Sequence, residues 1–164
     1  MSEQVQAPAL WRLLQHTAAV VQAVMAGQSM TARLEAMPVA LRPGVQALSF
    51  QVMRQLGRAR ALRALLAPRR PPPAVDALLC SALALCWDEA QSPYPSHTLV
   101  SQAVEAARQQ RQTQAQAGFI NACLRRFLRE RDTLLSRTAD DPQALWNHPE
   151  WWIERLKTDY PQQW

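Results

Sequence analysis

The sequence predicts an all-α protein, and three observations lead to that prediction. Alanine and leucine dominate the chain while glycine occurs only four times, a composition that favours helix over sheet. Apolar residues recur three and four positions apart in most segments between the prolines. No stretch alternates apolar and polar residues as a half-buried strand would. The length fits one domain, which would bury about two-thirds of its unfolded surface.

Prolines and polar residues divide the N-terminal half into four expected helices. Residues 1–7 are expected to be a frayed leader, after which Pro8 opens the first helix. Ser29 is a candidate N-cap for a short second helix, and Pro43 suits the first turn of the third. Gly57 marks either a break or a tight helix contact before the fourth. The four expected helices cover residues 8–26, 30–37, 43–56 and 59–66.

A proline-rich loop precedes the segment expected at the centre of the fold. Residues 68–73 read PRRPPP, which cannot be helical and would place Arg69 and Arg70 in solvent. Residues 74–87 are apolar on nearly every side, as is typical of a helix at the centre of a bundle. Two amphipathic helices are expected after it. They bring the expected total to about seven, including short ones, and cover residues 96–110 and 117–131.

The segment 117–131, AGFINACLRRFLRER, divides into two faces. Its apolar side chains, Phe119 and Phe127 among them, share one arc of the helix, and its arginines share the opposite arc. Gly118 lacks a Cβ atom and would let another backbone approach closely. We therefore expect this helix to bury one side and to expose a row of guanidinium groups. The row consists of Arg125, Arg126 and Arg129.

The basic residues are concentrated in the body of the chain. The formal net charge is +5, and Lys157 is the sole lysine. Between Glu35 and Asp76 there is no acidic residue, although seven arginines lie there, and the chain from Glu130 onward is net acidic. Arginine suits bidentate phosphate contacts and stacking on bases. A GC-rich genome would also favour arginine over lysine, and an arginine row on a helix can be simply a solvated face.

No motif in the sequence indicates a catalytic site or a metal site. Cys80, Cys86 and Cys123 lie among apolar residues without a C-x-x-C pair, so we expect buried thiols in a reducing cytoplasm. The three histidines have no metal-ligand spacing, and the isolated glycines form no phosphate-binding loop. No signal peptide or membrane-spanning run is visible. This segment is therefore expected to be non-catalytic and to hold neither metal nor cofactor.

After residue 135 the character of the sequence changes. Asp141 before a proline predicts a helix start, and Asn147 with Glu150 resembles a capping box. Because a free terminus seldom ends on an exposed tryptophan, Trp164 suggests that the chain was cut from something longer. Three further tryptophans would either close the core of this domain or pack on a neighbouring domain. They are Trp146, Trp151 and Trp152.

Residues 118–127, GFINACLRRF, resemble the closing-helix signature of the NusB-like domain, a helical RNA-binding module. This module occurs alone, as a transcription antitermination factor, and also in front of the catalytic domain of bacterial rRNA cytosine-C5 methyltransferases of the RsmB/Sun/Fmu type. The resemblance covers roughly residues 10–131 and includes the weaker segments 48–54 and 95–105. Three residues depart from the family pattern: Gln51, Ser101 and Gln102.

Residues 147–161 resemble the connector by which the methyltransferases leave their NusB-like domain. The resemblance therefore implies an RNA-binding domain over residues 1–137 and a connector over 138–164 toward a missing catalytic domain. That domain would bind S-adenosylmethionine. No cysteine here follows a proline, as the family's catalytic cysteines do. The alternatives are a stand-alone antitermination factor that pairs with a ribosomal protein, and a pure protein-interaction module.

The implied function is substrate targeting for a 16S rRNA cytosine-C5 methyltransferase. Arginines would contact phosphates of structured small-subunit rRNA, and such contacts position an RNA without reading its sequence. The expected RNA-binding residues are Arg12, Arg54, Arg58, Arg60, Arg63, Arg69, Arg70, Arg125, Arg126 and Arg129.

Overall fold

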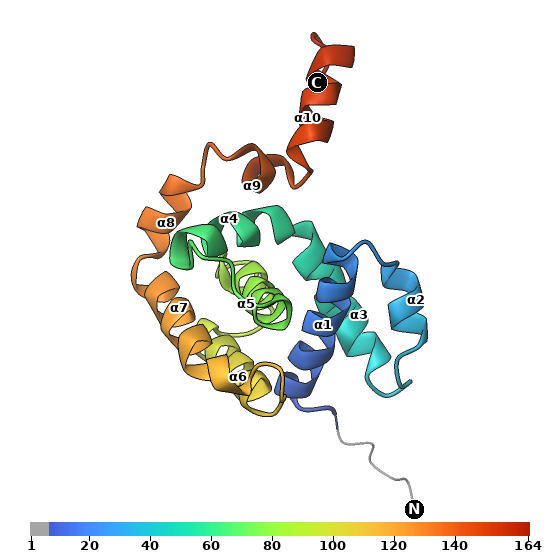
Figure 1. The fold of residues 1–164 in the computed structure, drawn as a ribbon, viewed down its shortest axis with the longest axis vertical. Coiled ribbons are helices and arrows are strands. Elements are labelled where there is room, and N and C mark those ends of the chain that lie inside the picture. The colour runs from blue at the N-terminus through green and yellow to red at the C-terminus, as the bar shows by residue number, and fades with distance from the viewer. Residues whose placement is uncertain (1–6) are drawn as a thin grey trace, which may run out of the picture.

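The computed structural model describes residues 7–164 and confirms the all-α prediction (Figure 1). Of the expected leader, residues 1–6 lie outside the described residues. The described chain contains ten α-helices, one 3-10 turn and no strand. All seven expected helices are present, and the additional ones lie in the C-terminal region. The helices are α1 (Leu10–Met25), α2 (Met30–Glu35), α3 (Arg42–Arg54), α4 (Leu56–Leu66), α5 (Pro73–Cys86), α6 (Ser96–Arg108), α7 (Ala117–Arg129), α8 (Arg131–Arg137), α9 (Pro142–Trp146) and α10 (Glu150–Asp159); the 3-10 turn is Gln114–Gln116.

Helix α5 is the centre of the bundle, as its apolar sequence predicts. Every residue from Val75 to Cys86 is buried. Figure 1 shows α1, α4, α6 and α7 arranged around this helix. Because α5 has no solvent-facing side beyond its first two residues, any polar side chain on it needs a partner inside the protein.

Helix α7 places its apolar arc against the bundle, with one departure from the expected pattern. Ile120 and Phe127 are fully buried, and Arg125 and Arg129 are exposed. Phe119, which the sequence assigns to the buried arc, retains 36% of its accessible surface. It lies in the first turn of α7, where the helix has just emerged from the loop after α6.

Two helix N-termini are capped by side chains that are distant in sequence. Neither α1 nor α4 has a cap from its own N-cap residue. The backbone N–H of Trp11 donates to Oε1 of Gln102 at 3.1 Å. The backbone N–H of Gly57 donates to Oδ1 of Asn147 at 2.7 Å. These contacts satisfy donors that the first turn of a helix leaves without an intrahelical partner.

We call residues 138–164 the tail and the helices α1–α8 the bundle. Asn147 connects the tail to the bundle, which corrects the expected capping box. It adopts a left-handed backbone conformation with φ 55° and ends α9, while α10 has no side-chain cap. Its Nδ2 donates to the carbonyl oxygen of Met53 at 2.8 Å. One side chain therefore serves the end of α3 and the start of α4. The expected cap at Asp141 is confirmed, since its carboxylate accepts from the N–H groups of Gln143 and Ala144.

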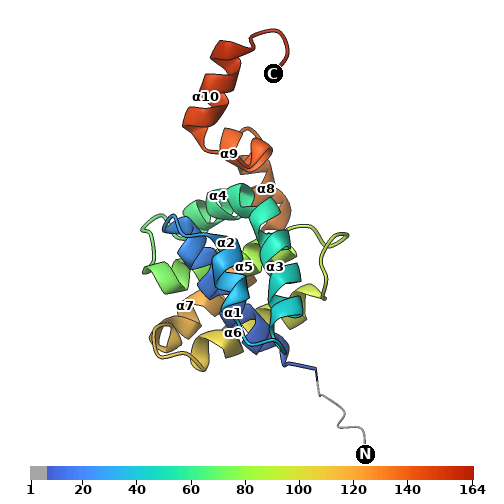
Figure 2. The ribbon, with the colours of Figure 1, turned by 90° about the vertical axis from the view of Figure 1, so that its right-hand side faces the viewer.

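The close backbone approach expected at Gly118 does not occur, whereas the tight helix contact that was one of the two alternatives at Gly57 does. A Cβ atom at Gly57 would lie 2.0 Å from the backbone oxygen of Gln143, whereas a Cβ at Gly118 would meet nothing within 4 Å. Gly57 therefore lets α9 pack directly on the first turn of α4. Helix α10 contacts α9 and projects away from the bundle (Figures 1 and 2).

Candidate nucleic-acid interface

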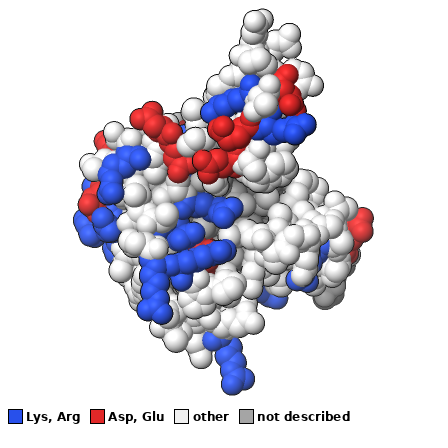
Figure 3. Space-filling model, turned by 45° about the horizontal axis from the view of Figure 1, so that its top comes forward, with Lys and Arg blue, Asp and Glu red and all other residues white. Residues whose placement is uncertain are grey.

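Basic side chains gather on the face of the bundle that includes α4 and α7. Figure 3 shows Lys and Arg across this face and a band of Asp and Glu at the base of the tail. The expected RNA-binding arginines do not form a single patch, because the structure distributes them over both ends of α5, over α7 and over the start of α1. Each group has its own partners.

The first group surrounds Asp76 near the N-terminal end of α5. Asp76 is completely buried and forms ion pairs with two arginines. Nε of Arg63 lies 2.9 Å from Oδ1, and Nε of Arg70 donates to Oδ2 at 3.0 Å. The carboxylate also lies in the first turns of α5, where the helix dipole favours negative charge. We call Arg63, Asp76 and Arg70 the Asp76 cluster.

The thiol of Cys80 completes the surroundings of Asp76. Its Sγ donates to Oδ1 of Asp76 at 3.6 Å. Burial, and then the negative charge of Asp76, raise the pKa of the Cys80 thiol to about 12. The thiol therefore stays protonated at neutral pH and remains a donor to the carboxylate. Cys86 and Cys123 are also buried and free, as the sequence predicts.

The structure removes Arg63 from the expected set of RNA-binding residues. Only 10% of its side chain is exposed, and its guanidinium neutralises the buried Asp76. A side chain in that position cannot reach an RNA phosphate. Arg70 differs, because 60% of its side chain is exposed although it binds the same carboxylate. Arg69 is exposed beside it in the loop.

The second group lies at the other end of α5. The guanidinium of Arg58 stacks over the indole of Trp87, 4.5 Å from the ring centroid. Arg54 is exposed and lines a hollow with Trp87 and Gln91. Trp87 follows Asp76 by eleven residues, so a helix places the two groups roughly 16 Å apart.

The arginines of α7 form the third group. Arg126 pairs with Glu130 through Nε and Oε2 at 2.6 Å, and Nε of Arg125 donates to Oδ1 of Asn121 at 3.0 Å. Both contacts join residues one turn apart at the protein surface, where such pairs add little stability. Arg129 is exposed and has no ion pair among the described residues. The row is therefore accessible to a polyanion.

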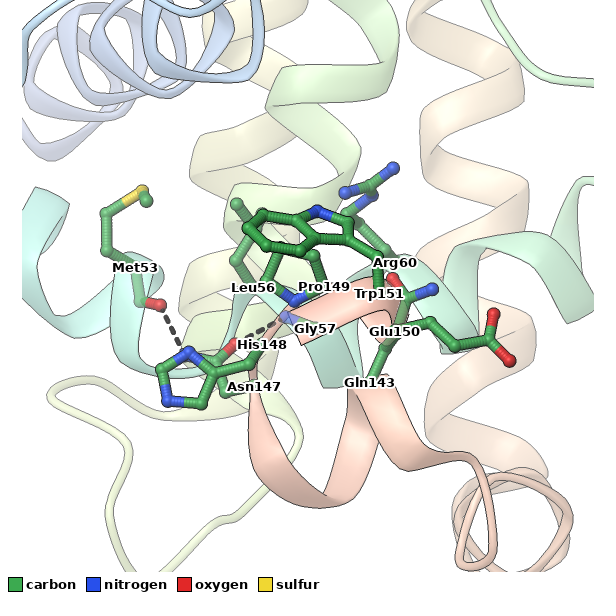
Figure 4. Close-up of a pocket in the computed structure, with 10 residues that line it drawn as sticks. All are labelled: Met53, Leu56, Gly57, Arg60, Gln143, Asn147, His148, Pro149, Glu150 and Trp151. Atoms are coloured by element: carbon green, nitrogen blue, oxygen red, sulfur yellow. Dashed lines mark hydrogen bonds between the residues drawn. The ribbon is translucent and has the colours of Figure 1, made fainter. Parts of the chain in front are cut away.

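Arg12 and Arg60 lie apart from these groups. Arg12 is exposed near the start of α1. The pKa of the nearby His16 is lowered, mainly by the burial of His16 itself and additionally by the positive charge of Arg12. Arg60 lines a cleft of about 590 Å³ between α4 and the tail. In Figure 4 the indole of Trp151 extends over this cleft in front of Arg60, and the Glu150 carboxylate points away.

The tail tryptophans do not close the core of the bundle. The exposed fractions of Trp146, Trp151 and Trp152 are 49%, 71% and 37%. Trp146 packs edge-on against Trp164 with ring centroids 5.7 Å apart, beside a hollow of about 340 Å³. Of the two alternatives that the sequence left open, the structure rejects a role in this domain's own core.

Sequence reasoning missed three side chains that organise this surface. Asp76 reads as a simple interruption of an apolar helix, and Asn147 reads as a local N-cap. Arg131 binds the carbonyl oxygen of Cys86 at 3.0 Å and pairs with Glu89, which fixes α8 to the end of α5. Only Asp76 left a usable signal: one acidic residue in an otherwise apolar helix, preceded by a long stretch that contains arginines but no acids.

The residues that the structure describes show no metal site and no membrane span. Among residues 7–164 no three His, Cys, Asp or Glu side chains come close enough together to hold a metal ion. Over the same residues, no helix combines the length and apolar character needed to cross a membrane.

These observations define the class of fold: a helical bundle with a buried central helix and basic groups on its surface. The NusB family model matches residues 5–129, and the chain therefore belongs to the NusB family. This finding confirms the family resemblance of the closing helix and its fold.

Curated relatives match part of the same region. The chain is 40% identical over 70 residues to the probable ribosomal RNA small subunit methyltransferase B of Coxiella burnetii. It is 41% identical over 71 residues to the ribosomal RNA small subunit methyltransferase B of Erwinia tasmaniensis, and 36% identical over 70 residues to that of Serratia proteamaculans. Each match covers 43% of this chain and 16% of the relative, in the relative's N-terminal region.

Proposed function

We propose that this chain is the RNA-binding, substrate-targeting part of a 16S rRNA cytosine-C5 methyltransferase that acts in the cytoplasm. Residues 1–137 would form the RNA-binding domain, and residues 138–164 the connector toward a catalytic domain that binds S-adenosylmethionine. The described residues supply no catalytic group in this proposal. Their task is to hold structured small-subunit rRNA so that the catalytic domain meets its target cytosine.

The strongest support is the exposed arginine surface of a NusB-family bundle whose matched relatives are small-subunit rRNA methyltransferases. Arg69 and Arg70 are exposed in the loop between α4 and α5, and Arg129 is exposed on α7. Among residues 7–164, none of the three pairs with a surface carboxylate. Exposed guanidinium groups bind RNA phosphates through their charge, and they follow the shape of the RNA rather than its base sequence. Arg12, Arg54, Arg58, Arg60, Arg125 and Arg126 would make further phosphate contacts.

The tail supports the second half of the proposal, a catalytic partner domain in the same protein. Its tryptophans are exposed, and residues 138–164 carry five acidic residues against two basic ones, so the tail suits a protein surface better than RNA. The tail would bind the catalytic domain while the bundle binds rRNA. Because α9 is fixed to α4 by Asn147, the two surfaces would keep a defined relative position.

Ultraviolet cross-linking to a small-subunit rRNA transcript, followed by mass spectrometry, tests this division. We expect cross-linked peptides from α4, the loop of residues 67–72 and α7, and none from α10. Cross-links confined to α2 or α10 would contradict the proposal. Cross-linking that added salt does not reduce would contradict it as well.

Membership of the NusB family also supports a second candidate, a stand-alone antitermination factor. That factor would bind RNA together with a small ribosomal protein. The two candidates differ in a simple measurement, because a targeting domain should bind the rRNA transcript unaided. Binding that appears only after a ribosomal protein is added would favour the antitermination factor.

A further inference from the structure

We propose that Asp76 is a positioning residue for RNA binding, which orients the guanidinium of Arg70 toward a phosphate of the RNA backbone. This inference rests on the proposed function and names one phosphate-binding element within it. An acidic residue would then promote the binding of a polyanion. That expectation is the opposite of what its charge alone predicts, and it makes the inference easy to test.

The geometry leaves Arg70 fixed but available. Its Nε is engaged by Oδ2 of Asp76 at 3.0 Å. A guanidinium has five N–H donors, so four remain on the two Nη atoms, and no residue in 7–164 accepts a hydrogen bond from them. With 60% of the side chain exposed, Arg70 is accessible to a ligand, and the fork geometry of a guanidinium matches a phosphate.

The backbone on either side of Arg70 is also restrained. The loop of residues 67–72 contains three prolines, and Pro71 is buried next to Arg70. Proline fixes its own φ angle and also restricts the residue before it. Both the backbone and the guanidinium of Arg70 are therefore held before a ligand arrives, which lowers the entropy lost on binding.

The local charge favours an anion despite the buried carboxylate. Arg63 and Arg70 together outweigh Asp76, and exposed Arg69 adds a further positive charge. No second carboxylate in the described chain pairs with Arg63 or Arg70. Asp76 is completely buried behind the arginines, so an approaching phosphate meets the guanidinium first.

A purely structural role does not account for Arg70. Arg63 alone, which is buried, can neutralise Asp76 and hold α4 against α5. An arginine with most of its side chain in solvent adds little stability to such a pair. The main effect of the contact between Arg70 and Asp76 is therefore to fix the direction in which the guanidinium of Arg70 points toward solvent.

The first experiment measures filter binding of the 164-residue chain to a small-subunit rRNA transcript. Asp76→Asn raises the net charge by one, which by electrostatics alone strengthens binding. We expect instead at least a fivefold loss of affinity, with the folded fraction of the variant measured by circular dichroism. The matched control is Glu35→Gln, an exposed site with the same charge change and no ion pair among the described residues. It should bind as well as the parent or up to twofold better.

The second variant, Arg70→Lys, keeps the inference testable if Asp76→Asn does not fold. It preserves net charge and changes an exposed side chain, but it removes the planar fork and the Nε contact. We expect at least a fivefold weaker affinity with an unchanged salt dependence. Arg108→Lys, at an exposed arginine of α6, should change affinity less than 1.5-fold.

A double-mutant cycle then separates positioning from general stability. If Asp76 acts through Arg70, Asp76→Asn should cost less than twofold in the Arg70→Lys background. Inorganic phosphate at constant ionic strength should not release the RNA, because the element is part of an extended backbone contact. Release by inorganic phosphate would identify a free-anion site and overturn the inference.

Besides release by inorganic phosphate, three results with the variants would overturn the inference. Asp76→Asn could bind as tightly as Glu35→Gln, or Arg70→Lys could bind like the parent. In the third, the affinity losses of the two substitutions multiply in the double variant, so that the residues act independently. These failures differ from failure of the proposed function. A parent chain without salt-dependent rRNA binding counts against the function itself. A parent that binds in a salt-dependent way while both cluster variants bind normally counts against this inference alone.

Discussion

In the bundle, α5 is enclosed by its neighbours, whereas in the tail Ile153 is the one buried residue of α10. The two regions also differ in charge. Residues 138–164 carry five acidic and two basic residues, and residues 1–137 carry 16 basic and eight acidic ones. The bundle therefore has a complete apolar core and a basic surface, while the tail leaves aromatic and acidic groups exposed. The two regions therefore present surfaces of different chemistry.

The largest effect should come from breaking the buried ion pair of the bundle. Asp76→Ala leaves the guanidinium of Arg63 buried without its carboxylate, which costs roughly 3–5 kcal/mol of unfolding free energy. Urea denaturation monitored by circular dichroism measures this loss of unfolding free energy. Asp140→Ala in the tail, at an exposed residue, should change stability by less than about 0.5 kcal/mol. Equal effects at the two positions would contradict the contrast between bundle and tail.

The junction between the two regions depends on the missing side chain of Gly57. Gly57→Ala would place a methyl group 2.0 Å from the backbone oxygen of Gln143, so α9 must shift. We expect a loss of about 1–3 kcal/mol and a change in tryptophan fluorescence. The matched substitution Gly118→Ala meets open space in a helix and should stabilise by roughly 0.5–1 kcal/mol. A harmless Gly57→Ala would mean that α9 does not pack on α4 in solution.

Removing the Asn147 side chain should loosen the same junction more gently. Asn147→Gly keeps a residue that adopts φ 55° without strain but deletes the contacts to Gly57 and Met53. We expect a loss of about 1–2 kcal/mol. Faster hydrogen exchange at the Gly57 amide is the direct readout. An unchanged exchange rate would show that water replaces the cap without cost.

The smallest effect concerns the pH dependence of the bundle. Burial, with help from Arg12, lowers the pKa of His16 below 6.5, so the folded state disfavours the protonated imidazole. The unfolded chain then binds more protons, and stability should fall as the pH drops below about 6.5. His16→Gln should remove this part of the pH dependence. Thermal denaturation of both chains between pH 7.5 and 5 measures it, and identical profiles would refute the assignment to His16.

Sequence patterns identified features whose cause is local. The apolar character of residues 74–87 predicted the central helix, and Ser29 and Asp141 were recognised as N-caps because their partners lie two or three residues away. Gln102 and Asn147 cap helices about 90 residues distant, so no local pattern reveals them.

The candidate interface shows the same division between local and distant causes. The arginine row of α7 follows from helical periodicity, but Arg63 is buried because α4 packs against α5. Periodicity gives the direction of a side chain relative to its own helix. It does not show which neighbouring helix will cover that direction.

The salt dependence of rRNA binding tests the central claim most directly. The dissociation constant of the whole chain is measured from 50 to 300 mM KCl, together with a bundle variant carrying Arg69→Gln, Arg70→Gln and Arg129→Gln. The tail variant carries Arg155→Gln and Lys157→Gln. We predict that the slope of log affinity against log salt falls by roughly 2–3 in the bundle variant and stays unchanged in the tail variant. Equal slopes in all three chains, or a larger change in the tail variant, would contradict an RNA-binding surface on the bundle.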